Sequence, residues 1–299
     1  MIAFVALLCI LGFGFDAFYI GAGGGFVPIG TVVALGVGSV SALTGYFRGD
    51  RAVLLATGAR PLDEVEVSAD DAGRLKLRQL GNVVDEMAIA AGVPRPKVYV
   101  VPDGDPNAFA TGRGPGHSSI AVTRGLLDAL DREELQGVVA HEMAHLANLD
   151  TRYMVIVGVT VGLIALVCDM LLRTMAWGGS GRSSSSDKKS SGAGLLIILL
   201  IVVAIFAPLA AKAVQMAVSR QREYLADATS VQFTRNPNGL ISALGKLADK
   251  AAPFPGVSRA TQHLFIVNPV QTFTAKSSAL MATHPDVADR IARLRNLGG

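Results

Sequence analysis

The stretch that decides the fold is "VVAHEMAHLANLD", Val138–Asp150, where two histidines stand four residues apart and a glutamate follows the first. Shortly before it, Asp131 is a good N-cap residue and Glu134 comes three positions later, which is the pattern of a capping box. The sequence therefore predicts a helix that runs through the stretch. Because residues i and i+4 lie on one face of a helix, His141 and His145 can bind one metal ion from consecutive turns.

Glu142 stands next to the first histidine and projects from the flank of the same helix face. From there its carboxylate reaches a water bound to the metal rather than the metal itself. Zinc suits this arrangement because it accepts neutral imidazole and keeps an open position for water in catalytic sites. The alternative is a helix whose histidines cap or pack without binding metal, and the predicted helical context of the motif argues against it.

A catalytic zinc site of this kind needs a third protein ligand, commonly from a second helix. The next histidine after His145 is His263, so the longer pattern that supplies a nearby third histidine is absent. Carboxylates are the better source, and "REYLAD" offers Glu223 and Asp227 at positions i and i+4. One of the two would bind the metal while the other accepts a hydrogen bond from a ligand imidazole. Taken alone, Glu223 would be a solvated charge beside two arginines.

Composition and long apolar runs predict a membrane protein. Hydrophobic residues make up 51% of the 299 residues and charged residues only 17%, with a mean hydropathy of +0.43. From Ile2 to Phe47 the only charged side chain is Asp16, and this length fits two membrane crossings of about 20 residues each. A cleaved signal peptide is the alternative, but no basic segment precedes the apolar run, and the apolar character continues beyond a normal cleavage region.

A part of mixed α/β character follows these two apolar runs. A helix is expected from an N-cap at Ser68 to Gly92, and strands are expected in "KVYVV" (97–101) and "SSIAVT" (118–123). Two further apolar runs come later, separated by the Gly/Ser-rich residues 178–194, for which we expect a disordered linker.

Five short motifs resemble, in this order, the HtpX branch of membrane-integrated zinc metalloproteases, which is related to the CAAX-processing protease Ste24. They are "NAFATG", "TRGLL", "HEMAHLANLD", "SRQREYLAD" and "THPDVADRI". The similarity covers essentially the whole chain, and the combination is far more specific than HExxH alone. The main departure is the Ser-rich insertion between the third and fourth apolar runs, which concerns that hairpin and not the site.

With this resemblance, the expected fold class is a mainly α integral membrane protein with a mixed α+β, zincin-like catalytic domain. Its segments are 1–47 (a transmembrane hairpin of two spans), 48–152 (the N-terminal part of the catalytic domain with the zinc helix), 153–218 (the third and fourth hydrophobic helices) and 219–299 (the C-terminal part of the catalytic domain).

The resemblance also implies an activity, zinc-dependent endopeptidase, with one Zn²⁺ per chain. Carried over by position, it implies that His141, His145 and Glu223 are the zinc ligands. It implies that Glu142 is the general base and that Asp227 is a partner of a ligand histidine. Glu142 would take a proton from the zinc-activated water that attacks the peptide carbonyl and return it to the leaving amine. No separate nucleophile motif such as GxSxG is present. The implied role is quality control of misfolded or damaged membrane proteins.

Three further residues are candidates for contacts with the substrate. His284 of "THPDVADRI", with Arg290 nearby, is the candidate donor to the oxyanion of the tetrahedral intermediate. The alternative for His284 is a histidine at a helix start, before Pro285. Asn107 and the backbone after it in "NAFATG" would lie beside the substrate as an edge strand, and a simple structural turn is the alternative.

The sequence also excludes some partners and cofactors. The net charge of +3 is not concentrated in a basic stripe, so nucleic-acid binding has no support. Cys9 and Cys168 lie in separate apolar runs and form no CxxC pair, which excludes a thiolate zinc site. The expected partners are polypeptide substrates, membrane proteins above all, and the lipid bilayer.

The side of the membrane follows from charge bias. Arginines after the second apolar run, and basic residues at the end of the fourth, place the catalytic face in the cytoplasm of a cell-membrane protein. Four basic residues oppose this assignment because a true third and fourth crossing would export them; they are Arg173, Arg182, Lys188 and Lys189. A shallow hairpin in place of two full spans is therefore open.

Two other classes of protein compete with the protease. A non-catalytic metal-binding membrane scaffold would be expected to close its metal with four protein ligands, often thiolates. This chain offers three ligands and an acid placed to act on water. A transporter would be expected to show more spans and internal repeats, and neither is visible in the sequence.

Overall fold

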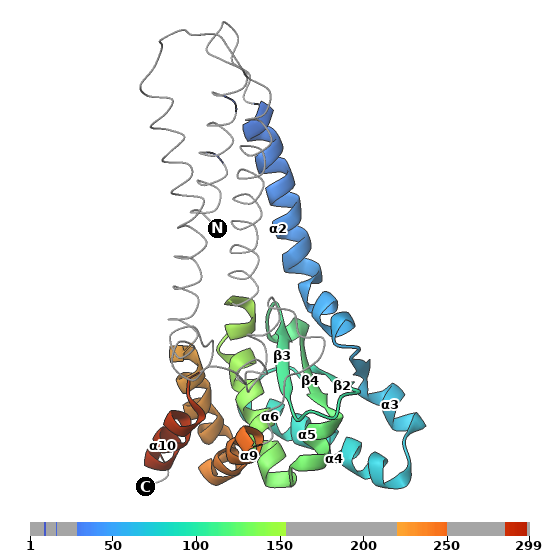
Figure 1. The fold of residues 1–299 in the computed structure, drawn as a ribbon, viewed down its shortest axis with the longest axis vertical. Coiled ribbons are helices and arrows are strands. Elements are labelled where there is room, and N and C mark those ends of the chain that lie inside the picture. Colours follow the sequence, from blue (N-terminus) through green and yellow to red (C-terminus); the bar gives the residue numbers. More distant parts are fainter. Residues whose placement is uncertain (1–8, 10–15, 17–28, 154–219, 250–284, 298–299) are drawn as a thin grey trace, which may run out of the picture. The chain divides into compact units, whose positions relative to one another are not determined.

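The computed structural model describes residues 29–153, 220–249 and 285–297, together with Cys9 and Asp16 (Figure 1). The chain divides into two compact units, residues 1–46 with 156–215 and residues 47–155 with 216–299, and each is described by itself. The third and fourth apolar runs, the Gly/Ser-rich segment and most of the first apolar hairpin lie outside the described residues.

The described part of the first unit is mainly the start of α2, a helix that spans Ile29–Ala56. Asp16 is fully buried, and its Oδ2 accepts hydrogen bonds from the backbone N–H and the hydroxyl of Thr31, at 2.9 and 2.8 Å. The backbone bond satisfies a donor in the first turn of α2, where N–H groups have no partner within the helix. Within the described ranges, no helix is long and apolar enough to cross a membrane.

A small mixed sheet forms one layer of the second unit. Its strands are β1 (Arg60–Pro61), β2 (Lys97–Val101), β3 (Ala108–Gly112) and β4 (Ser118–Thr123), in the order β1-β2-β4-β3. β2 and β4 are parallel, and the other two pairings are antiparallel. The two strands expected from the sequence are thus present as β2 and β4. The "NAFATG" segment adds β3 at the edge of the sheet.

Two helices precede β2 in the chain, and the second of them begins at a clear capping residue. α3 (Leu62–Ser68) is followed by α4 (Asp71–Ala91), which ends at Gly92 with φ +64°. The N-cap expected at Ser68 is wrong, because Asp70 caps α4 by accepting a hydrogen bond from Gly73 N at 2.9 Å. Ser68 instead ends α3 and donates its hydroxyl to Val65 O. A short helix, α5 (Arg124–Ala129), follows β4.

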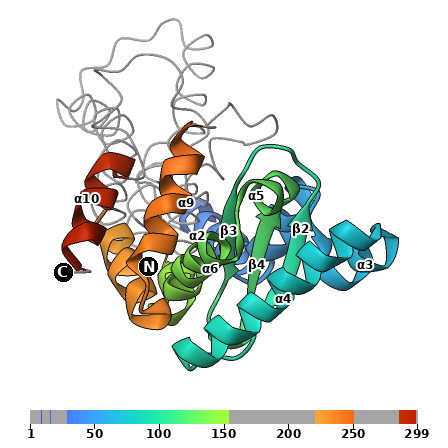
Figure 2. The same ribbon diagram turned by 90° about the horizontal axis from the view of Figure 1, so that it is seen from below.

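The predicted HExxH helix is α6, which spans Arg132–Ala147. Its capping box is present: the Asp131 carboxylate accepts from Glu134 N at 3.0 Å, and the Glu134 carboxylate accepts from Asp131 N at 2.9 Å. α6 is buried on nearly every side, since it contacts α4, β3 and α9 (Pro237–Asp249). Figure 2 shows α6 between the sheet and α9.

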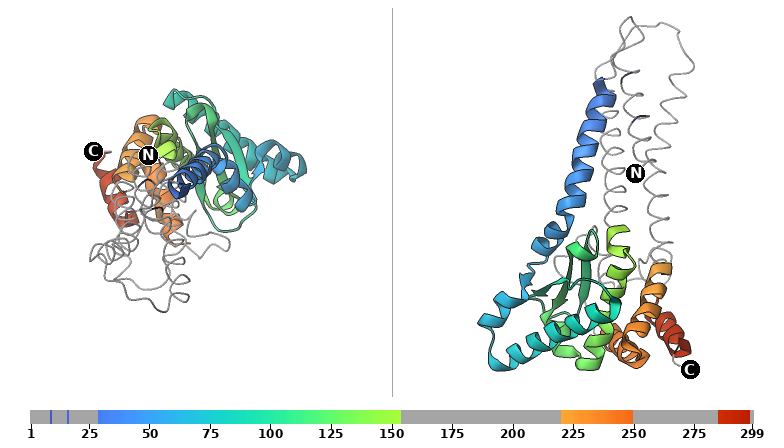
Figure 3. Two further views of the ribbon diagram at one scale, coloured as in Figure 1. Left: turned by 90° about the horizontal axis from the view of Figure 1, so that it is seen from above. Right: turned by 180° about the vertical axis from the view of Figure 1, so that it is seen from behind.

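Close helix packing and a C-terminal helix complete the second unit. A Cβ at Gly137 would lie 2.6 Å from Leu240 N, so α6 and α9 meet where only hydrogen fits. α10 (Val287–Leu297) packs against α9 (Figure 3). The helix over residues 220–234 carries Tyr224, whose ring lies 3.7 Å from the Arg293 guanidinium of α10. These contacts bring segments distant in sequence to the buried face of α6.

Candidate metal centre

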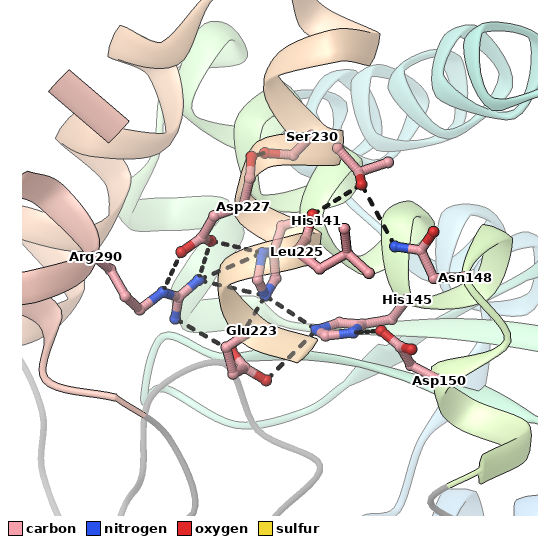
Figure 4. A network of polar contacts seen from close by, with 10 residues as sticks. His141, His145, Asn148, Asp150, Glu223, Leu225, Asp227, Ser230 and Arg290 are labelled. Atoms are coloured by element: carbon pink, nitrogen blue, oxygen red, sulfur yellow. Dashed lines mark hydrogen bonds and ion pairs between the residues drawn. The ribbon is translucent and has the colours of Figure 1, made fainter. Parts of the chain in front are cut away.

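The candidate ligands lie together at the C-terminal half of α6 (Figure 4). His141 and His145 stand on consecutive turns, and their Nε2 atoms are 3.2 Å apart. Glu223, from the helix over residues 220–234, points at both rings: its Oε2 is 3.6 Å from His141 Nε2 and its Oε1 is 3.6 Å from His145 Nε2. One ligand atom from each residue lies within 4.8 Å of the others, a spacing that fits one metal ion.

The donor set also fits a metal by its chemistry. Two imidazole nitrogens and one carboxylate oxygen are the protein ligands that catalytic zinc sites use, with one position left for water or substrate. His141 and Glu223 are almost completely buried, and His145 is only slightly exposed. The three side chains expected from the sequence as ligands are therefore brought together in a site of suitable composition.

Each histidine has a carboxylate behind it. Asp227 Oδ1 lies 3.0 Å from Nδ1 of His141, and Asp150 Oδ2 lies 2.7 Å from Nδ1 of His145. A carboxylate at Nδ1 keeps that nitrogen protonated and turns Nε2 toward the metal. The sequence pointed to Asp227 but not to Asp150, although Asp150 closes the quoted motif. The sequence signal that could have identified Asp150 is an acidic residue just beyond the end of the helix that carries His145.

Arg290 of α10 lies inside the site. Its Nε and Nη2 donate hydrogen bonds to the two carboxylate oxygens of Asp227 at 2.9 and 2.6 Å, and its Nη1 is 3.6 Å from Glu223 Oε2. Its Nη2 also lies 3.4 Å from ring nitrogens of His141. The side chain is fully buried. One guanidinium thus compensates two buried carboxylates that would otherwise repel each other.

These neighbours shift the pKa values of the two histidines in opposite directions. Burial and the Arg290 guanidinium lower the pKa of His141, but hydrogen bonds to Asp227 and Glu223 outweigh them and raise it to about 9. Burial and the charge of His141 lower the pKa of His145, more than Glu223 raises it. Burial raises the pKa of Asp227, but Arg290 and His141 outweigh it and lower that pKa to about 2.

Glu142 lies beside the ligands and against the sheet. It is buried, and it takes a backbone hydrogen bond from Ala110 of β3. Burial raises the pKa of its carboxyl group, and this outweighs the lowering by His141 and His145. A carboxyl group with a raised pKa at the flank of the ligand face is placed to take up and return a proton.

The remaining candidate residues are placed differently. Asn107 is buried at the start of β3, where its backbone N–H donates to Thr123 Oγ1 at 2.7 Å and its Oδ1 accepts from Ala108 N at 2.9 Å. These bonds fix the beginning of the edge strand. His284 lies outside the described residues.

The fold and the site together define the class of protein. A helix that carries HExxH, a carboxylate from a second helix and a small sheet beside the first helix are the features of zincin-like metallopeptidases. Residues 74–297 match peptidase family M48. The chain belongs to this family, among the HtpX proteases, and the protein is a metalloprotease. The resemblance found in the five sequence motifs is thereby confirmed.

Relatives and a solved structure agree with this assignment. A "Protease HtpX homolog" of Caldanaerobacter subterraneus subsp. tengcongensis is 44% identical over 252 residues, which are 84% of this chain and 79% of the relative. One of Streptococcus uberis is 39% identical over 296 residues, 97% of this chain and 96% of the relative. The crystal structure of S. mikatae Ste24p has a similar fold, with a TM-score of 0.55 and 19% identity. That similarity covers 98% of this chain and 62% of the Ste24p chain.

Proposed function

We propose that the protein is a membrane-bound zinc endopeptidase that cleaves peptide bonds with His141, His145 and Glu223 as zinc ligands. The observation that carries the proposal is the convergence of three ligand atoms within 4.8 Å. The carboxylate behind each histidine supports it, because such partners orient ligand imidazoles. Zinc bound here supplies Lewis acidity, which polarises the scissile carbonyl and acidifies water.

Glu142 is the general base in this proposal. Its carboxylate takes the proton of the attacking water and then gives it to the nitrogen of the leaving amine. Burial raises the pKa of Glu142, which favours its protonated form and so supports the second step. The backbone hydrogen bond from Ala110 holds the carboxyl group beside the ligand face.

The edge strand β3 is the proposed binding site for the peptide backbone. Thr123 N donates to Asn107 O, so by antiparallel alternation the backbone groups of Ala108 and Ala110 face away from β4. A substrate strand that pairs with that edge has to replace the bonds from Ala108 N to Asn107 Oδ1 and from the Ala110 backbone to Glu142, and Asn107 contributes by fixing where β3 starts. Because all five residues of β3 are buried, the edge has to open to admit a peptide.

Stabilisation of the oxyanion is assigned to His284, and Arg290 contributes indirectly through Asp227 and Glu223. Nε and Nη2 of Arg290 both donate to Asp227, so this arginine sets the charge and position of Asp227 and Glu223. His284 comes six positions earlier in "THPDVADRI" and is the proposed direct donor. Both roles are predictions from the resemblance.

The proposed location is the cell membrane, with the catalytic domain facing the cytoplasm. The apolar runs of the sequence and the arginines that flank them support this, as does the relationship to HtpX proteases. The proposed task is the removal of misfolded or damaged membrane proteins. A reporter fused within residues 178–194 tests the topology, and a cytoplasmic signal there would exclude four full spans.

The activity is tested with Glu142→Gln. We expect about a 10²–10⁴-fold loss of cleavage of a casein-type substrate, because the general base is removed. Zinc content should stay at that of the wild type, since Glu142 is not a ligand. Glu86→Gln is the matched control, because Glu86 is a half-buried acid of α4 that pairs with Arg132 and Gln136 in the first half of α6.

Measuring cleavage and zinc content in the wild type and in Glu142→Gln also distinguishes a protease from a non-catalytic metal-binding scaffold. A scaffold would hold zinc and show no chelator-sensitive cleavage in either protein. Unchanged cleavage by purified Glu142→Gln would exclude Glu142 as the base. A wild-type protein purified in detergent without bound zinc would exclude the zinc centre.

A further inference from the structure

The turn that follows α6 has an unusual backbone. α6 ends at Ala147 with Asn148 as its C-cap, and the next helical residues are 150–153. Between them, Leu149 has a φ of +59°. A leucine rarely adopts this left-handed conformation, which favours glycine and asparagine. The turn is therefore held by its surroundings and not by the preference of its own residue.

The turn brings Asp150 back to the metal centre. On a continuous helix, residue 150 would be rotated by about 140° from His145, because five residues advance by about 100° each. In the structure Asp150 is buried, and its Oδ2 lies 2.7 Å from Nδ1 of His145. The left-handed residue at position 149 is what allows an acid so near in sequence to reach the back of the imidazole.

Arg222 holds the turn from the neighbouring helix. Its Nη2 donates to Asn148 O at 3.0 Å and forms an ion pair with the Asp150 carboxylate. Its guanidinium carbon also lies 5.0 Å from the centre of the Tyr153 ring. Arg222 immediately precedes Glu223, so one helix carries both the arginine that holds the turn and the third candidate ligand.

We propose that Asp150 and Arg222 are positioning residues for the metal centre, an inference that rests on the proposed function. Asp150 accepts the Nδ1–H of His145 and leaves Nε2 directed at the metal. Arg222 holds the Asp150 carboxylate and, through its place beside Glu223, fixes the third ligand relative to α6. The pair thus joins the two helices that supply all three ligands.

A purely structural ion pair predicts a different result. An arginine–aspartate pair that only stabilises the fold would change unfolding and leave metal affinity alone. In this structure the carboxylate is bonded to a ligand on one side and to the arginine on the other, so its removal should reach the metal. Losses of about 10- to 100-fold in metal affinity are usual when such a partner of a ligand histidine is removed.

The test uses the full chain in detergent, with the variants Asp150→Asn, Arg222→Gln and Arg222→Lys. Zinc affinity is measured by competition with a chromogenic chelator, and ligand geometry by the visible spectrum of the cobalt-substituted protein. Unfolding is measured on the metal-free protein. The matched controls are Asp128→Asn and Arg78→Gln, which remove one partner of the exposed pairs Lys76–Asp128 and Arg78–Glu66.

We expect Asp150→Asn to weaken zinc affinity about 10- to 100-fold and to change the cobalt spectrum. Arg222→Gln should give a smaller loss and Arg222→Lys should restore part of it. Because the two residues act on one imidazole, the double variant Asp150→Asn with Arg222→Gln should lose less than the sum of the single losses. The controls should bind zinc like the wild type.

Two outcomes would overturn the proposals separately. If the wild type binds no zinc, the proposed function itself fails. If the wild type binds zinc and both Asp150→Asn and Arg222→Gln match it within twofold, the positioning role is wrong and the protease assignment stands, even if unfolding is affected. Should Asp150→Asn not fold, the two Arg222 variants decide by the same criterion.

Discussion

The two candidate ligand histidines have the same kind of support, built in two different ways. Behind His141 stand Asp227 and then Arg290, and all three side chains are almost completely buried. Behind His145 stand Asp150 and then Arg222, whose side chain is 25% exposed. The first set of contacts is almost completely buried, and the second is partly exposed both at Arg222 and at His145.

Their origins in the sequence also differ. The buried chain joins α6, the helix over residues 220–234 and α10, so Arg290 comes 149 positions after His141. In the second chain, Asp150 comes from the turn directly after α6, only five positions beyond His145. Both Asp227 and Arg290 reach His141 from distant segments, whereas in the second set only Arg222 comes from a distant segment. The contacts from His141 through Asp227 to Arg290 should therefore contribute more to stability than those from His145 through Asp150 to Arg222.

The largest expected effect comes from Arg290→Met. It removes the positive charge between Asp227 and Glu223 while keeping most of the volume, and leaves buried carboxylates without compensation. We expect a loss of about 3–5 kcal/mol in the free energy of unfolding of the metal-free protein. Adding Asp227→Asn should recover part of the loss, because it removes one of the two charges.

Two matched variants sharpen this result. Arg293→Met, one turn from Arg290 on α10, removes a contact between an arginine and the Tyr224 ring and should cost about 1 kcal/mol or less. Arg222→Met should fall between them, since water can reach its guanidinium. If Arg222→Met lowers the free energy of unfolding as much as Arg290→Met does, the difference in burial between the two arginines has no effect on stability.

An intermediate effect is expected from Gly137→Ala, one turn before His141 on α6. The new Cβ would lie 2.6 Å from Leu240 N, a backbone atom that cannot rotate away. Overpacking of this kind costs about 1–3 kcal/mol. Movement of α6 away from α9 should weaken zinc affinity as well, because His141 moves relative to Asp227 whereas Asp150 moves with α6.

The control for this variant is on the facing helix. A Cβ at Gly245 of α9 meets no atom within 4 Å, so Gly245→Ala should be neutral or stabilise by up to about 1 kcal/mol. A zinc affinity of Gly137→Ala equal to that of the wild type would mean that the α6–α9 contact does not position His141.

The smallest effect concerns an acid on α6 that touches neither histidine. Burial raises the pKa of Glu134, but hydrogen bonds from Lys246, Ser242 and the Asp131 backbone outweigh it and lower that pKa. A lowered pKa in the folded state stabilises the protein above the unfolded value of about 4.3, and the contribution is lost as the pH falls below it. Lys246→Met should remove much of this contribution.

Melting temperatures of the metal-free protein at pH 7 and pH 4 measure the effect. The difference between the wild type and Lys246→Met should be larger at pH 7 and should shrink at pH 4. Zinc affinity at pH 7 should not change, because Lys246 and Glu134 do not contact the ligands. A weaker zinc affinity would mean that any charge on α6 affects metal binding. The contacts behind His141 and His145 would then have no special role.

Much of the local structure could be predicted from the sequence because it depends on short-range rules. The capping box of α6 and the strands β2 and β4 lie where alternation and capping residues placed them. The cap of α4 was assigned wrongly because both Ser68 and Asp70 are suitable residues, and only the position of α3 decides between them. Helical periodicity likewise paired Glu223 with Asp227.

Asp150 was missed for a physical reason. Helical geometry places a residue five positions after His145 on another face, and nothing in the identity of Leu149 predicts a left-handed turn. Arg222 was seen only as a neighbouring charge, since its partners belong to another helix. Arg290 was found through a family pattern, and its hydrogen bonds to Asp227 could not be inferred from spacing.

The sequence by itself indicated the class of protein through the resemblance of five motifs. It also predicted that His141 and His145 can reach one metal ion, because residues four apart on a helix are neighbours in any fold. Only the tertiary structure decided which carboxylate stands behind which histidine and which arginine neutralises it. Those pairings depend on how closely α6 meets α9 at Gly137 and on the turn at Leu149. Both are properties of packing between segments, and no periodicity along one segment encodes them.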